Sequence, residues 1–264
     1  MDVRSKKQWT PLHHASYNAK LKIAHLFLDH GAKVDTVDVL GRTPLHWVSQ
    51  GNYASDEAGI GVAKLLLERG AGVDSRSKEQ WTPLHHACYF AKLEIVRLLL
   101  DHGAKVDAVD GQGNTPLHSV SGSEYAYEET GVGVARLLLE RGAEVNAQRK
   151  NQCTPLHDAS LCGGKLELVR VLLDRGAKVE AVDNRGDTPL HNVSQGKKDE
   201  DAGVGIARLL LERGADVNTK NRSGETPLDL ASERPKVAQL LIEHGAIAGV
   251  DTRAGSSLIS FFKR

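Results

Sequence analysis

The chain has 264 residues, enough for one large domain or two ordinary ones. Apolar residues make up 40% of the sequence and charged residues 26%, which is typical of a globular protein and excludes a disordered chain. Lys plus Arg and Asp plus Glu number 34 each, so the balanced charge favours neither nucleic acid nor an acidic membrane as a partner.

The cysteines and the lengths of the apolar runs indicate in which cellular compartment the protein is expected. Cys88, Cys153 and Cys162 are odd in number and form no C-x-x-C pair, which argues against a disulfide framework or a zinc site. The N-terminal residues lack the apolar core of a signal peptide, and no apolar run approaches a membrane span. We therefore expect an intracellular protein, cytoplasmic or nuclear.

A four-residue motif recurs along the whole chain. The sequence TPLH begins at residues 10, 43, 82, 115, 154 and 188, and TPLD begins at 226. Successive starts lie 33, 39, 33, 39, 34 and 38 residues apart, so a short repeat alternates with a long one. Residues 2–50 closely match residues 74–122. Periods in this range predict an array of stacked structural repeats.

Each motif predicts the start of a helix. Thr10 can cap the helix with its hydroxyl group, and Pro11 suits the first helical position because its missing N–H is not needed there. Leu12 then points inward, and His13 can bond back to the cap or across to the neighbouring repeat. Asp229 replaces the histidine in the last motif, which favours a hydrogen-bonding role over metal binding.

A second helix follows in each repeat. Residues 21–28 are apolar on nearly every side, so this helix needs a neighbour on both flanks. Gly31 supplies a left-handed stop, and the pattern recurs at residues 93–103 and 166–176. One repeat alone cannot bury such faces, so neighbouring repeats must cover them.

These motifs resemble the ankyrin-repeat family. The family pattern is matched by GNTPLHSVS, KLEIVRLLLDHGAKVD and RLLLERGADVN, and the resemblance covers residues 2–246. It implies an all-α solenoid of stacked helix-turn-helix units joined by β-turn fingers, with an array of about seven repeats at residues 1–246. Residues 247–264 resemble a partial capping repeat, whose hydrophobic side chains would be Leu258, Ile259, Phe261 and Phe262.

The sequence departs from the family pattern in two places. Gln8, Gln80 and Gln152 stand where other fingers have glycine, and we expect a different turn there because glutamine disfavours positive φ. The even repeats carry acidic insertions of about six residues, beginning at Gly51, Gly122 and Gly196. We expect these to be surface loops opposite the fingers, either solvated edges or sites for a basic partner. Basic residues mark the odd fingers: Arg4, Lys6, Lys7, Arg76, Lys78, Arg149 and Lys150.

No motif indicates catalysis, a cofactor or a metal. The helix-capping role accounts for the six TPLH histidines, and we expect no metal at them. The three G-x-G sequences lack the preceding strand and third glycine of a nucleotide-binding motif, so we interpret them as tight helix entries. We therefore expect that the protein is not an enzyme and binds no cofactor.

The resemblance also implies which residues line a binding groove. In the family, the residue before TPLH and residues on the first helix face the concave side, and all three tryptophans fall at such positions. Aromatic and arginine residues are typical anchors of binding energy, but Trp9 and Trp81 could instead pack over neighbouring fingers. The predicted groove residues are Trp9, His14, Tyr17, Asn18, Arg42, Trp47, Trp81, His86, Tyr89, Phe90, Asn114, Ser119, Cys153, Asp158, Leu161, Asp187, Asn192 and Glu225.

The predicted function is a non-catalytic protein-interaction module. We expect a monomer that binds a protein segment or folded domain along the groove, mainly through the aromatic repeats one to four. An alternative is an engineered or array-derived scaffold without a physiological partner, because the repeated blocks are nearly identical and the chain starts within a finger without a polar cap.

Overall fold

The computed structural model describes residues 5–51, 56–126, 128–161, 165–196 and 199–248. Every regular element in these ranges is an α-helix, which confirms the predicted all-α class. The chain divides into two compact units, residues 1–143 and 144–264, and each is described by itself. We number the repeats 1 to 7 by their Thr-Pro-Leu motifs.

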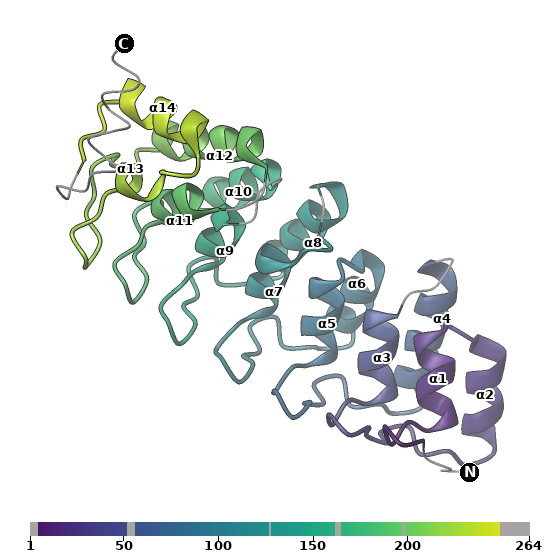
Figure 1. Cartoon of the computed structure of the whole chain (residues 1–264). Helices are drawn as coiled ribbons and strands as arrows, with labels where there is room; N and C mark the ends of the chain where they lie inside the picture. Colours follow the sequence, from purple (N-terminus) through teal and green to yellow (C-terminus); the bar gives the residue numbers. More distant parts are fainter. Residues whose placement is uncertain (1–4, 52–55, 127, 162–164, 197–198, 249–264) are drawn as a thin grey trace. The chain divides into compact units, whose positions relative to one another are not determined.

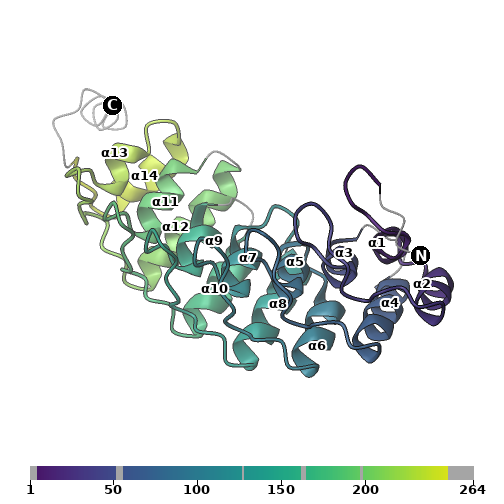
Figure 2. The same cartoon turned by 90° about the horizontal axis from the view of Figure 1, so that it is seen from below.

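Unit 1 holds repeats 1 to 4 as two layers of helices. The first helices of the repeats, α1, α3, α5 and α7, pack side by side in one layer, and the second helices, α2, α4, α6 and α8, form the other (Figure 2). The bounds are α1 (Pro11–Tyr17), α2 (Leu21–Asp29), α3 (Pro44–Gln50), α4 (Asp56–Glu68), α5 (Pro83–Tyr89), α6 (Leu93–Asp101), α7 (Pro116–Gly122) and α8 (Glu128–Glu140).

Unit 2 repeats the arrangement with repeats 5 to 7. Within it α11 packs against α9 and α13, and α12 packs against α10 and α14, while the finger turns project from one end of the helices (Figure 1). The bounds are α9 (Pro155–Leu161), α10 (Leu166–Asp174), α11 (Pro189–Gln195), α12 (Glu200–Glu212), α13 (Pro227–Leu230) and α14 (Pro235–Glu243).

The TPLH motif starts each first helix as predicted. In repeat 2, the backbone N–H of Thr43 donates to Nδ1 of His46 at 3.1 Å, which completes a capping box. Because Nδ1 accepts, the imidazole proton lies on Nε2, which donates to the carbonyl oxygen of Trp81 in the next repeat at 3.0 Å. The histidine thus caps its own helix and ties two repeats together. The same bond to the next finger is made by His13, His85, His157 and His191.

The hydrophobic core lies between the two helix layers, and in the first repeat the second helix is less covered than in the later repeats. The motif leucines are buried throughout, as Leu12, Leu45 and Leu84 show. Helix α6 is covered on both flanks as expected, because α4 and α8 pack against it. Helix α2 was expected to be covered likewise, but Ile23 and other apolar side chains on it are exposed.

The expectation of a different turn in the odd fingers is wrong. Gln80 adopts φ 66°, close to the φ 73° of Gly41, and Gln8 and Gln152 adopt φ 57° and 64°. The backbone bonds agree as well, since Gln80 N donates to Ser77 O at 2.9 Å and Gly41 N donates to Asp38 O at 3.0 Å. Hydrogen bonds between successive fingers hold this shape against the strain of a left-handed glutamine.

The acidic insertions are only partly loops. Helices α4, α8 and α12 each have 13 residues against nine in α2, α6 and α10, so each insertion adds about one helical turn. The G-x-G sequences therefore lie inside these helices and not at their entries. Their second glycines permit close packing, because a Cβ at Gly61 would come within 3.2 Å of the Leu21 side chain.

Some expectations fall outside the described residues. The predicted capping side chains lie in residues 249–264, which are outside the described residues, so the domain boundary at residue 246 stays a prediction. Arg4 also lies outside them, so its place among the basic residues of the first finger stays a prediction. Among the helices that the structure describes, none combines the length and apolar character needed to cross a membrane.

Candidate protein-binding surfaces

Repeats 1 and 2 hold a group of packed rings, on their first helices and in the finger before α1, which we call the first aromatic cluster: Trp9, His14, Tyr17 and Trp47. Trp9 lies at the centre, with ring centroids 4.1 Å from Trp47, 4.6 Å from His14 and 5.9 Å from Tyr17. Trp47 is buried, whereas Trp9 and Tyr17 are half-buried and His14 is exposed. The cluster therefore presents aromatic surface to solvent on a rigid helical base.

A buried carboxylate fixes the orientation of Trp47. Asp38 accepts the indole N–H of Trp47 at 3.1 Å and pairs with Arg42 at 3.0 Å, and the Arg42 guanidinium lies 3.8 Å above the Trp47 ring. Burial alone would raise the pKa of Asp38. Hydrogen bonds from the backbone N–H groups of Arg42 and Leu40, together with the Arg42 charge, outweigh burial and hold the pKa below its usual value. Asp38 is therefore held as a carboxylate, and Trp47 serves as a support for Trp9.

The second aromatic cluster lies one two-repeat block further along unit 1. It consists of Trp81, His86, Tyr89, Phe90 and Tyr125, with Trp81 5.7 Å from Tyr89 and Phe90 4.9 Å from Tyr125 by ring centroids. Tyr125 comes from the insertion of repeat 4 and is exposed. Trp81, Tyr89 and Phe90 are half-buried, so this cluster also combines packing with an accessible aromatic face.

His86 belongs to the base of the second cluster and not to its surface. Its ring lies edge-on to His46 at 5.5 Å and to Trp81 at 5.0 Å, and its Nδ1 is buried without a hydrogen-bond partner. Burial and the neighbouring His46 hold the pKa of His86 well below its ordinary value. Both histidines are therefore neutral at pH 7.

Unit 2 carries a polar cleft in place of aromatic rings. The cleft, of about 530 Å³, lies between the fingers of repeats 6 and 7 and is lined by Asn184, Arg185, Asp187, Gln195, Asn221, Arg222, Ser223, Glu225 and Leu230. Asp187 is buried in its wall and accepts bonds from Arg185 at 3.0 Å and Asn221 at 2.8 Å. Amide, guanidinium and carboxylate groups around the cleft suit hydrogen bonding to a polar surface.

The basic residues of the odd fingers divide into two groups. Arg149 pairs with Asp158 at 2.8 Å, and Arg76 donates to the carbonyl oxygen of Val109 in the next finger at 2.7 Å, so both help to hold the fold. Burial raises the pKa of Asp158 to about 6 despite the Arg149 charge. The exposed lysines, which keep a basic margin, are Lys6, Lys7, Lys78 and Lys150.

The predicted groove residues fall into two sets. Six are buried and present little surface to a partner, because neighbouring repeats cover them: Trp47, His86, Ser119, Cys153, Asp187 and Asn192. Those exposed or half-buried are Trp9, His14, Tyr17, Asn18, Arg42, Trp81, Tyr89, Phe90, Asn114, Asp158, Leu161 and Glu225. The structure brings some of them together, in the two aromatic clusters of unit 1 and, for Asp187 and Glu225, in the cleft of unit 2. The residues that belong to none of these groups are Asn18, Asn114, Ser119, Cys153, Asp158, Leu161 and Asn192.

Two contributors were missed by the sequence reasoning. Asp38 orients Trp47, and its signal is an acidic residue four positions before Arg42. Tyr125 was treated as part of an acidic loop, although an aromatic residue in an insertion beside Tyr89 and Phe90 signals a ring contact. Within the described residues, no three His, Cys, Asp or Glu side chains are grouped as metal ligands, and the thiols of Cys88 and Cys153 are buried.

Comparison with known proteins agrees with this architecture. A model of ankyrin repeats in three copies matches residues 1–76, 52–148, 124–221 and 176–252. The crystal structure of the human ASB11 ankyrin repeat domain is similar at 26% identity and a TM-score of 0.76, over 90% of this chain and 99% of that one. The crystal structure of the ankyrin repeat domain of Bcl-3, described as a unique member of the IkappaB protein family, is similar at 31% identity and a TM-score of 0.64. That match covers 89% of this chain and 98% of the Bcl-3 chain.

A search of curated proteins found no match to the sequence. The family model, however, spans most of the chain in four overlapping segments. The chain therefore belongs to the ankyrin-repeat family.

Proposed function

We propose that this protein is a non-catalytic interaction module that binds a protein partner through the aromatic surface of unit 1. Ankyrin repeat domains generally mediate protein–protein interactions. In this chain the partner would contact the two aromatic clusters.

The observation that carries the proposal is the recurrence of half-buried rings on the first helices and in the fingers just before them. Trp9 and Tyr17 in repeat 1 correspond to Trp81 and Tyr89 in repeat 3, 72 residues on, and all four keep part of their surface exposed. Aromatic side chains bury a large area with little loss of rotamer freedom, so they serve well as binding anchors. Their rigid supports, such as Trp47, limit the entropy lost on binding.

The polar cleft of unit 2 would add specificity. Glu225 and Arg185 line this cleft and could bond a polar or charged segment of a partner, and such contacts orient a partner more than they add affinity. We expect the aromatic clusters to supply most of the binding free energy.

The experiment is affinity capture with the wild-type protein beside a Trp9→Ala/Trp81→Ala double variant and a Val109→Ala control, which changes an exposed finger residue. We expect one reproducible partner with the wild type and the control, and its loss with the double variant. Absence of any reproducible partner would favour the alternative of a scaffold without a physiological partner. An intracellular location remains part of the proposal.

A further inference from the structure

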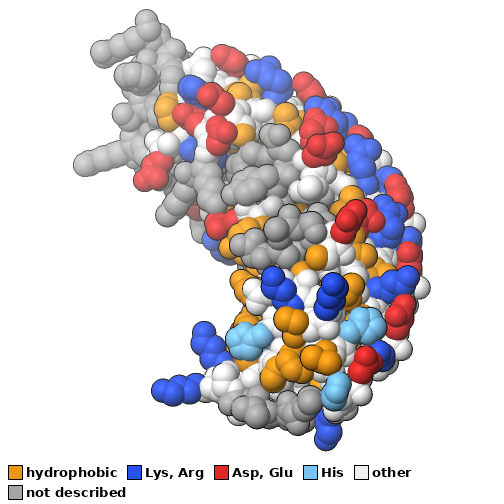
Figure 3. Space-filling model, turned by 90° about the vertical axis from the view of Figure 1, so that its right-hand side faces the viewer, with side chains coloured by type: hydrophobic (Ala, Val, Ile, Leu, Met, Phe, Trp, Pro, Cys, Tyr) orange, Lys and Arg blue, Asp and Glu red, His pale blue; other side chains and the backbone are white. Residues whose placement is uncertain are grey.

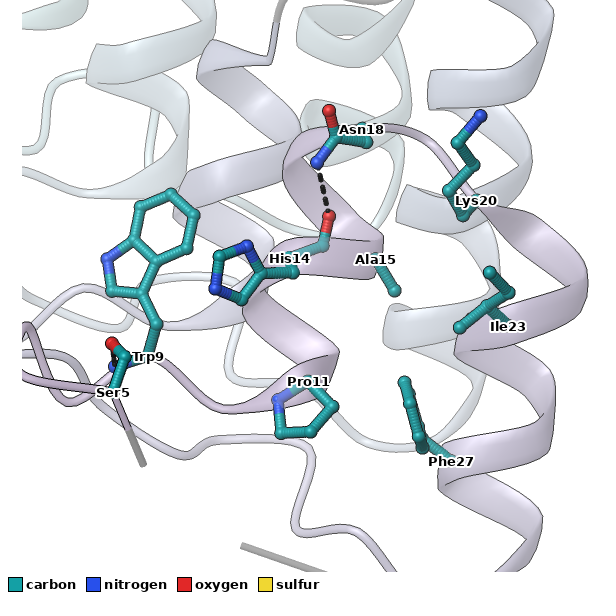
Figure 4. Close-up of a pocket in the computed structure, with 9 residues that line it drawn as sticks. All are labelled: Ser5, Trp9, Pro11, His14, Ala15, Asn18, Lys20, Ile23 and Phe27. Carbon is teal, nitrogen blue, oxygen red and sulfur yellow. Dashed lines mark hydrogen bonds between the residues drawn. The ribbon is translucent and has the colours of Figure 1, made fainter. Parts of the chain in front are cut away.

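The outer face of repeat 1 is an open apolar surface. Ile23 is 45% exposed on α2, and hydrophobic side chains gather on this end of unit 1 with lysine and histidine side chains around them (Figure 3). A groove of about 590 Å³ runs between α1 and α2 (Figure 4). Its lining is mostly apolar and contains no carboxylate: Ser5, Trp9, Pro11, His14, Ala15, Asn18, Lys20, Ile23 and Phe27.

The chain shows, in its own repeat 3, what covers such a face. Ile23 corresponds to Ile95, which is only 2% exposed, and Phe27 corresponds to Leu99, which is fully buried. Both are covered because α3 and α4 of repeat 2 pack against α5 and α6. Other matched positions are identical in the two repeats: Pro11 with Pro83, His14 with His86 and Ala15 with Ala87. Repeat 1 thus presents a face whose residue types suit coverage by helices.

The charges at the start of α2 indicate the chemistry of the covering helix. Lys20 and Lys22 are exposed there. Counting back from the Gly-Ala that follows each second helix, they correspond to Arg234 and Lys236 at the start of α14. Helix α12, which packs against α14, therefore serves as a template for a helix that could cover α2.

In unit 2 that template is the acidic first turn of α12. Lys236 Nζ pairs with Asp201 at 2.7 Å, and Lys236 N donates to the Glu200 carboxylate at 2.7 Å. Arg234 donates to the carbonyl oxygen of Asp199 at 2.9 Å, just before the helix begins. The acidic first turn of α12 thus meets Lys236 through carboxylates, whereas the residue before the helix meets Arg234 through its backbone carbonyl oxygen. Acidic residues at a helix start also complement the helix dipole.

We propose that the open face of repeat 1 binds an amphipathic helix of another polypeptide, whose first turn is acidic. The acidic turn pairs with Lys20 and Lys22, and the apolar side of the helix fills the groove over Ile23 and Phe27. A second copy of the same face is a poor occupant, because α2 has no acidic residue in its first turn to pair with Lys20 and Lys22. The groove shares Trp9 and His14 with the first aromatic cluster, but Ile23, Lys20 and Lys22, whose substitution tests the proposal, belong to neither cluster.

The probe is a fluorescein-labelled peptide with the sequence of residues 199–213, DEDAGVGIARLLLER, followed by fluorescence anisotropy with the full chain. We expect saturable binding that Ile23→Glu weakens at least tenfold and Lys20→Glu/Lys22→Glu weakens at least fivefold. Val109→Glu is the matched control, because Val109 is 48% exposed on a finger far from the groove in sequence, and should bind as the wild type does.

A charge exchange separates docking from loss of fold. A peptide with lysine at the positions of Asp199, Glu200 and Asp201 should bind the Lys20→Glu/Lys22→Glu variant better than the wild type. Circular dichroism should show an unchanged helix signal for that variant. The proposal is overturned if the wild type shows no saturable binding, if Ile23→Glu binds equally well, or if the charge exchange restores nothing. A wild-type dimer that Ile23→Glu converts to monomer would also overturn it.

Discussion

His46 Nε2 lies 3.0 Å from the carbonyl oxygen of Trp81, so one imidazole ring joins the start of α3 to the next finger. The other ring nitrogen accepts the N–H of Thr43, and the ring is buried. Since one nitrogen accepts and the other donates, only the neutral ring satisfies both bonds. The link between these two repeats is therefore sensitive to acid.

This link predicts a pH dependence of stability. Burial lowers the pKa of His46 to about 4 from the usual value near 6.5. Because the pKa of His46 is lower in the folded protein than in the unfolded chain, neutral His46 stabilises the fold fully above pH ~6.5. This stabilisation is lost as the pH falls towards 4. The free energy of unfolding should fall by about 3 kcal/mol, because each unit of pKa difference corresponds to roughly 1.4 kcal/mol. Urea denaturation measured between pH 7 and pH 4 checks it.

The control for this prediction is His46→Gln, because glutamine can keep the capping bond to Thr43 but does not titrate. At pH 7 we expect the variant to be less stable by about 1–3 kcal/mol, through loss of the bond to Trp81. The difference from the wild type should shrink as the pH falls. Parallel stability curves over the whole range would show that His46 is not the titrating group.

The finger turns predict opposite effects for two reciprocal substitutions. Gln80→Gly should raise the free energy of unfolding by about 0.5–1 kcal/mol, because it relieves a side chain held at φ 66°. Gly41→Gln should lower it by more than about 1 kcal/mol, since the new Cβ would also lie 3.1 Å from the backbone nitrogen of Lys78. Chemical denaturation measures both, and a destabilised Gln80→Gly variant would contradict the account.

The glycines inside α12 predict a contrast between neighbours. A Cβ at Gly203 would overlap the guanidinium of Arg234, which is buried and bonded to Val193, so Gly203→Ala should destabilise the protein by about 2 kcal/mol. At Gly205 a Cβ would meet only a methyl group of Leu166 at 3.4 Å. Gly205→Ala should be neutral or stabilising, because alanine favours helix. Thermal melts of the two variants decide the matter, and equal losses would contradict it.

The parts of the fold predictable from sequence are those set by local chemistry. Thr43 and His46 stand three residues apart, and a capping box needs no more than that spacing. The turn at Gln80 was mispredicted because its conformation is set by another finger: Lys78 N donates to Leu40 O at 2.8 Å across the repeats. A strain of about 1 kcal/mol is small beside several such bonds.

The same reason limits prediction of the candidate site. The position of Trp47 on its helix suggests a groove residue, but its burial depends on Asp38 and on Trp9 of the preceding repeat. The contacts of Trp81 with His86 and Tyr89 depend less on other repeats, because Trp81 lies just before α5, which carries both partners. Contacts between repeats depend on backbone geometry that the residue pattern does not display.

The most direct test of the central claim is the affinity of the captured partner for the wild type and for Trp81→Ala and Tyr89→Ala. We predict that each variant binds at least fivefold more weakly, which is about 1 kcal/mol, while its melting temperature stays within about 2 °C. Unchanged affinity, or a loss of stability in place of affinity, would contradict the claim and leave these rings as packing residues.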